Sequence, residues 1–129
     1  MTRIYDFLKE AGTYYLATVE DGQARVRPFG TIDIFEGKLT FQTGRIKPCY
    51  RQMKDNPYVE ICAMVGGDWI RVSGKVEECP VEAEVHMLEA YPHLKAMYQP
   101  GDGNSVVFAF TSGTATIASF TKEPVTIEF

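Results

Sequence analysis

Two arginines at alternating positions, Arg25 and Arg27 in the stretch GQARVRPFG, have a spacing that suggests chemistry. Residues two apart on an extended chain point to the same face, so the two guanidinium groups would lie side by side. Pro28 follows at once and has no backbone N–H to give to a sheet. Guanidinium groups bind phosphate through paired hydrogen bonds, so this face could hold an anion.

A second polar set follows in FQTGRIKP, at the end of another predicted strand. Gln42 and Thr43 offer an amide and a hydroxyl group, and Arg45 and Lys47 add positive charge. Backbone N–H groups near Gly44 would stand just before a helix begins, and helix N-termini attract phosphate. With the arginine pair, this set predicts a phosphate pocket. The alternative interpretation is an ordinary solvated face.

The charge distribution favours a local anion site. Residues 25–54 hold seven Lys and Arg against two acids, whereas residues 55–129 hold four against eleven, within a net charge of −4. A nucleic-acid surface would be more broadly basic, so we expect no nucleic-acid partner.

The elements that must position these residues follow from periodicity and turn signals. Helices are predicted over 2–12, 47–54, 81–91 and 93–98, and strands over 13–19, 24–35 (broken near Pro28–Gly30), 39–43, 58–65 and 69–79. A final hairpin is predicted over 106–120, with its turn at Ser112–Gly113. Hairpin turns dominate and parallel β-α-β alternation is absent. This order predicts a mainly β fold with flanking helices, an antiparallel barrel of six to eight strands.

Composition restricts the class of protein. At 129 residues we expect one domain over 1–129, and no apolar run of about 18 residues predicts a membrane span. The N-terminus lacks the apolar region of a signal peptide, so we expect a soluble, cytoplasmic protein. The three cysteines lack zinc spacing, and Pro92 separates His86 from His93, so no metal site is predicted.

Four stretches together resemble the small members of the pyridoxamine 5′-phosphate oxidase-related family of FMN-binding split barrels. They are YYLATVEDGQARVRPFG, GKLTFQTGRIKPCYRQMKDNPYVEIC, WIRVSGKV and LEAYPHLKAMY, which occur in the family's order and cover most of residues 13–120. The resemblance implies a Greek-key-like split barrel with FMN bound at the interface of a homodimer.

The resemblance also assigns roles by position. It implies that Arg25, Arg27, Pro28 and Phe29 lie along the ring and phosphate of FMN, that Gln42 and Thr43 supply polar contacts, and that Arg45 and Lys47 hold the phosphate. Which arginine meets the phosphate and which the ring stays open.

The partner chain of such a dimer would contribute Trp69 and Arg71, which alternate on one predicted strand. The alternatives are that Trp69 is a simple interface or core anchor, and that Arg71 pairs with a nearby carboxylate, such as one of Glu60, Glu77 or Glu78. The stretch YPHLKAMY could form the rim of a substrate pocket, although helix packing is the preferred interpretation for Leu94 and Met97.

The resemblance implies an FMN-dependent oxidoreductase, such as a flavin reductase, with NAD(P)H as a candidate electron donor; no catalytic residue is assigned. True pyridoxamine phosphate oxidases carry a C-terminal Arg-Leu-x-Pro-like segment, which TKEPVTIEF lacks, so we do not expect that reaction. The alternatives are a flavin-binding, sensing or stress protein without turnover, or a haem- or F420-binding relative.

Overall fold

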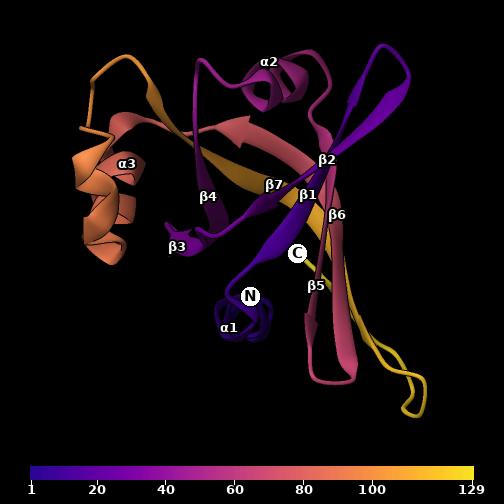
Figure 1. Cartoon of the computed structure of the whole chain (residues 1–129). Helices are drawn as coiled ribbons and strands as arrows, with labels where there is room; N and C mark the ends of the chain where they lie inside the picture. Colours follow the sequence, from indigo (N-terminus) through magenta and orange to yellow (C-terminus); the bar gives the residue numbers. More distant parts are fainter.

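The computed structural model describes all residues, 1–129, as a twisted sheet of eight strands with helices around it (Figure 1). The elements are, in chain order, α1 (Thr2–Ala11), β1 (Tyr14–Glu20), β2 (Gln23–Phe29), β3 (Asp33–Phe35), β4 (Lys38–Gly44), α2 (Pro48–Asp55), β5 (Tyr58–Val65), β6 (Asp68–Glu78), α3 (Val81–Ala90), the short 3₁₀ helix η1 (Pro92–Ala96), β7 (Ser105–Ala118) and β8 (Val125–Glu128). The predicted mainly β fold with flanking helices is confirmed.

The strands pair in the order β2-β1-β5-β6-β7-β4-β3, all antiparallel, and β8 pairs with β7. β2 and β3 lie at the two ends of this order and do not pair with each other, so the barrel is split rather than closed. The chain crosses this split between Phe29 and Asp33, where the sequence predicted a break.

The core fills the concave side of the sheet. Leu16, Phe41, Ile61, Ile70 and Phe108 are at most 1% exposed and belong to one continuous apolar cluster. Inward-facing residues alternate with outward-facing ones along β1 and β5, as expected for strands buried on one face.

Helices cover the two ends and one flank of the sheet, as Figure 1 shows. α1 buries Ile4 and Leu8 in the core, and it ends at Gly12, whose φ of 76° only glycine adopts readily. α3 packs against β3, β4 and β7. None of the helices is both long and apolar enough to cross a bilayer.

The predicted hairpin over 106–120 is wrong. β7 runs without interruption from Ser105 to Ala118, and the chain reverses only beyond it, before β8. Gly113 serves close packing rather than a turn, because a Cβ there would lie 2.7 Å from Cζ of Phe129 and 2.8 Å from the carbonyl oxygen of Ser73. The turn-like dipeptide Ser112–Gly113 therefore marks a contact between strands.

Candidate functional site

Two adjoining hollows lie where β2 ends and α2 begins. The first, called here the cationic hollow, has a volume of about 510 Å³ and includes Arg25, Arg27, Lys47 and Gln52 in its lining. The second, called here the amide hollow, has a volume of about 170 Å³ and includes Gly30, Thr31, Gln42, Leu94, Met97 and Tyr98 in its lining. Pro28, Phe29 and Lys47 line both, so a long ligand could extend from one to the other.

The guanidinium group of Arg27 is held by three uncharged acceptors. Its Nη1 donates to the carbonyl oxygen of Leu16 at 3.1 Å and to Oγ1 of Thr18 at 2.9 Å, and its Nη2 donates to Oε1 of Gln52 at 2.6 Å. Thr18 and Gln52 are buried, at 1% and 4% exposed. No carboxylate pairs with Arg27, so the side chain is fixed in place while its charge stays uncompensated.

Arg25 points to the same face as Arg27, as the spacing predicted, because it pairs with Thr18 across the β1–β2 ladder and Arg27 pairs with Leu16. Its Nη2 lies 3.5 Å from a carboxylate oxygen of Glu20, and its side chain is half-exposed. Glu20 is the one acid in the lining of the cationic hollow. Three cations and one carboxylate leave two positive charges in excess there.

Lys47 stands directly before the first residue of α2. Its backbone is extended, and Pro48 then begins the helix, a position that suits proline because the first N–H has no partner within the helix. The Lys47 side chain is exposed and makes no ion pair or hydrogen bond within the chain. A free ammonium group therefore stands beside the N-terminus of a helix, which also favours anions.

Pro28 and Phe29 form an apolar ridge between the two hollows. β2 lies at the edge of the sheet, where the missing N–H of Pro28 is tolerated. The Phe29 ring packs edge-on against Phe41, with centroids 5.7 Å apart, and is tilted against Tyr14 at 6.0 Å. The core thus holds this ridge rigidly, and a flat apolar ligand could lie on it.

Gln42 and Thr43 point in opposite directions from β4. Thr43 faces the core, where its Oγ1 lies 3.3 Å from Sγ of Cys49, and it lines neither hollow. Gln42 faces the amide hollow and is 6% exposed; its Nε2 donates to Oγ of Ser105 at 2.9 Å. Oε1 of Gln42 is buried without a partner.

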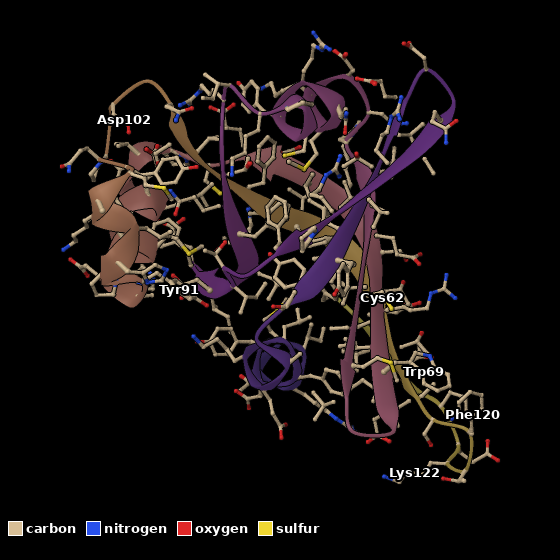
Figure 2. All side chains as sticks on the ribbon, viewed as in Figure 1. Cys62, Trp69, Tyr91, Asp102, Phe120 and Lys122 are labelled. Atoms are coloured by element: carbon tan, nitrogen blue, oxygen red, sulfur yellow. The ribbon has the colours of Figure 1, made fainter.

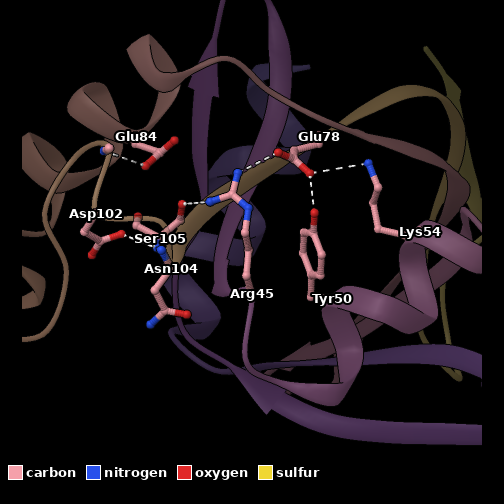
Figure 3. A network of polar contacts seen from close by, with 9 residues as sticks. Arg45, Tyr50, Lys54, Glu78, Glu84, Asp102, Asn104 and Ser105 are labelled. Carbon is pink, nitrogen blue, oxygen red and sulfur yellow. Dashed lines mark hydrogen bonds and ion pairs between the residues drawn. The ribbon is translucent and has the colours of Figure 1, made fainter.

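Arg45 lines neither hollow and instead joins a separate polar network (Figure 3). Its Nη1 donates to the carbonyl oxygen of Ser105 at 2.9 Å, and its Nη2 donates to Oε2 of Glu78 at 2.7 Å. Tyr50 and Lys54 donate to the other oxygen of Glu78, at 2.9 and 3.4 Å. Burial alone would raise the pKa of Glu78, but these donors together lower it. Arg45 therefore ties β4 to β6.

Trp69 and Arg71 lie on β6, away from both hollows of their own chain. Trp69 stands at the far end of the sheet beside Phe120, with the two ring centroids 5.1 Å apart (Figure 2). Arg71 pairs with Glu60 at 2.8 Å, which is the alternative that its sequence context left open. The chain alone does not bring these two residues to the site.

Three residues of the segment after α3 wall the amide hollow. Leu94 and Tyr98 pack against Leu88, which confirms the packing interpretation for Leu94. The packing interpretation is wrong for Met97, which is 70% exposed at the rim of the hollow. Gln52, which sequence reasoning missed, has no local signal, since its role depends on where α2 meets the β1–β2 hairpin.

The histidines and cysteines lie apart from the two hollows, except Cys49 in the lining of the cationic hollow. Nδ1 of His86 contacts a carboxylate oxygen of Asp33, and no three His, Cys, Asp or Glu side chains gather as a metal site would need. Burial raises the pKa of the Cys79 thiol to about 11.

Comparison with known proteins identifies related chains. A family model described as pyridoxamine 5′-phosphate oxidase matches residues 2–117. The crystal structure of a NimC/NimA family protein from Clostridium acetobutylicum is 45% identical with a TM-score of 0.96, and the match covers 100% of this chain and 92% of that one. No curated protein matches.

Two more distant structures share the fold. A pyridoxamine 5′-phosphate oxidase-related, FMN-binding protein from Nostoc punctiforme is 14% identical with a TM-score of 0.62, and the match covers 99% of this chain and 95% of that one. A haem-binding protein from Mycobacterium smegmatis is 12% identical with a TM-score of 0.74, with coverage of 94% of this chain and 57% of that one.

Proposed function

Because the chain belongs to the pyridoxamine 5′-phosphate oxidase family, we propose that it binds FMN in the two adjoining hollows and acts as an FMN-dependent oxidoreductase. In this proposal the phosphate of FMN occupies the cationic hollow, and the isoalloxazine ring lies on the ridge of Pro28 and Phe29 toward the amide hollow.

The observation that carries the proposal is the excess of two positive charges in the cationic hollow. Arg27 is held only by uncharged acceptors, and Lys47 has no partner in the chain. A phosphate monoester carries about −1.5 to −2 charges at neutral pH, which matches this excess. The fixed guanidinium group needs no rearrangement to donate to it, and little conformational entropy is lost on binding.

The remaining surfaces suit the rest of the cofactor. The volume of about 510 Å³ lies within the range of small-molecule sites, and the ridge offers an apolar surface to a flat ring. When bound, FMN would supply the transfer of hydride or electrons. The chain's own residues would anchor the phosphate, orient the ring and exclude water from its apolar face.

A second copy of the chain is the partner that we propose for the outer face of the sheet. Tyr15, Val26 and Met64 are 51%, 68% and 59% exposed on this face. Arg71 and Glu60 form an exposed ion pair on this face, so these two charges balance each other. A face with exposed apolar side chains and a paired charge suits a self-complementary, two-fold contact. Such a contact would bring Trp69 and Arg71 toward the flavin of the neighbouring subunit.

Haem is a weaker candidate for this site, although one structure of the same fold is that of a haem-binding protein. A haem iron commonly needs an imidazole ligand. Neither His86 nor His93 lines the hollows, and His86 is engaged by Asp33. The excess of cations also suits a phosphate at least as well as it suits two propionates.

The visible absorption spectrum of the purified protein, recorded after adding FMN and removing the excess, tests the proposal. We expect a retained flavin spectrum, at about one FMN per chain for equivalent sites in a symmetric dimer. Adding NADPH without oxygen, followed by an electron acceptor, then separates the two classes of protein. Bleaching and recovery at catalytic rates support an oxidoreductase with NAD(P)H as donor. A flavin that stays oxidised indicates a binding or sensing protein, and a protein that releases FMN contradicts the proposal.

A further inference from the structure

The amide hollow contains an unsatisfied hydrogen-bond acceptor. Only two buried side-chain atoms of the chain lack a partner, Oγ1 of Thr40 and Oε1 of Gln42. A buried polar atom without a partner costs free energy, so native proteins leave few of them unless a ligand or water completes the bond. Of these two residues, only Gln42 lines a hollow.

The Gln42 amide is oriented by its other end. Nε2 donates to Oγ of Ser105, which is fully buried on β7, and this bond leaves Oε1 as the free end. Leu94 and Met97 form an apolar wall of the same hollow, and the side-chain donors in its lining, Thr31, Lys47 and Tyr98, make no hydrogen bond to this oxygen. A ligand that brings an N–H or O–H group into the hollow would therefore complete the hydrogen bonding of Oε1 of Gln42.

The size of the hollow limits what can enter it. A cavity of about 150 Å³ is enough for a single benzene-sized ring, and the amide hollow has about 170 Å³. The three fused rings of a flavin do not fit, but one end of them does. The benzenoid end carries methyl groups and no donor, whereas the pyrimidine end carries the N3–H group between two carbonyl groups.

We propose that Gln42 is a specificity-determining residue whose Oε1 accepts a hydrogen bond from the flavin N3–H, so that the imide edge of the ring enters the amide hollow. This inference rests on the proposed function, because it specifies which edge of the same bound FMN contacts Gln42. It favours flavins and deazaflavins, which share this edge, over haem, whose propionate oxygens would face another acceptor.

The test compares FMN with 3-methyl-FMN, in which a methyl group replaces the N3 hydrogen. Dissociation constants are measured by quenching of flavin fluorescence for the wild-type chain, Gln42→Leu and Gln42→Met. Thr40→Val is the matched control, because Thr40 lies on the same strand with an equally unpartnered buried oxygen but lines neither hollow. Circular dichroism checks that each variant is folded, and two replacements at Gln42 guard against the failure of one.

Wild type should prefer FMN over 3-methyl-FMN by at least about tenfold, the effect expected for one buried hydrogen bond. In the Gln42 variants FMN should weaken about tenfold and the preference should disappear, while Thr40→Val should behave like wild type. A preference that persists in the folded Gln42 variants overturns the contact but not FMN binding. A wild-type chain that binds neither flavin overturns the proposed function and the contact with it.

Discussion

Arg27 and Gln52 lie 25 residues apart in the sequence, on β2 and α2, yet Nη2 of the arginine donates to Oε1 of the glutamine over 2.6 Å. The same oxygen also accepts the hydroxyl of Thr18, and Nε2 of Gln52 donates to Glu20 at 3.3 Å. An uncharged side chain thus holds the guanidinium group without neutralising it. A glutamate in its place would keep the shape and cancel the charge.

Gln52→Glu should therefore weaken FMN by about tenfold or more, because a carboxylate beside Arg27 competes with the phosphate. Riboflavin, which lacks the phosphate, should lose little affinity. Titration calorimetry with both ligands measures the difference. Gln23→Glu, which adds the same charge at an exposed position of β2, the strand that carries Arg27, should leave both affinities near wild type. Equal losses for FMN and riboflavin in Gln52→Glu would assign Gln52 to folding alone.

Substitutions of Lys47 and Arg45 should differ in their effect on FMN affinity, although the sequence resemblance implied that both residues hold the phosphate. Lys47→Ala removes an unpartnered cation and should weaken FMN about 10- to 100-fold, with little effect on riboflavin. Arg45→Ala should keep FMN affinity near wild type and instead lower the melting temperature, since Arg45 bonds Glu78 and Ser105. A comparable loss of FMN affinity in both variants would indicate that Arg45 also contacts the phosphate.

The Glu78 network predicts a dependence of stability on pH. Burial opposes the charge of Glu78, but Arg45, Tyr50 and Lys54 lower its pKa below the ordinary 4.5. A lowered folded-state pKa contributes stability above the unfolded pKa, and this contribution is lost as pH falls through the folded one. Glu78→Gln should therefore cost about 1–2 kcal/mol at pH 7, and the difference from wild type should shrink below about pH 4.5.

Urea unfolding of wild type and Glu78→Gln between pH 3 and 7 measures this difference. Glu77→Gln, at an exposed position next along β6, serves as the matched control and should show no comparable change. A constant gap between wild type and Glu78→Gln at all pH values would contradict a role for the ionised carboxylate.

The cysteines report on the proposed dimer. Cys62 is exposed on the outer face of the sheet, whereas Cys49 is buried and the thiol of Cys79 has its pKa raised to about 11. Iodoacetamide at pH 8 should spare Cys49 and Cys79, and it should modify Cys62 slowly if a second copy covers this face. Met64→Asp, which places a charge on the same face, should yield monomers by light scattering and speed the modification of Cys62. Rapid labelling of Cys62 in wild type would argue against this interface.

The sequence predicted most helices and strands because their signals are local. The alternation of Arg25 and Arg27 on β2, the break after Phe29 and the helix after Lys47 all follow from spacing and turn residues within a few positions. The Ser112–Gly113 dipeptide misled the prediction because Gly113 is needed for close packing against Phe129 and Ser73, which are distant in the sequence.

The candidate site was likewise predictable only where its residues carry a local signal. Residue types and spacing picked out Lys47, Gln42 and the arginine pair, which do line the two hollows. Spacing could not tell that Arg45, two residues before Lys47, turns to Glu78 on β6. Spacing also could not find Gln52, because its contact with Arg27 depends on how α2 packs on the β1–β2 hairpin.

β7 runs through both ends of the sheet, so the hydrogen exchange of its amides reports on the opening of the whole molecule. Its first residues pair with β4, the strand that carries Gln42, its last residues pair with β6 beside Trp69, and β8 pairs with part of its other edge. Phe108 and Ala109 pair with both β4 and β6, and residues 114–117 pair with both β6 and β8, so the amides of these two segments cannot meet solvent until neighbouring strands separate, whereas Thr111 and Ser112 between them are exposed. In deuterated water these amides should be among the last to exchange, at a rate set by global opening, so one slow signal reports the lifetime of both ends of the sheet.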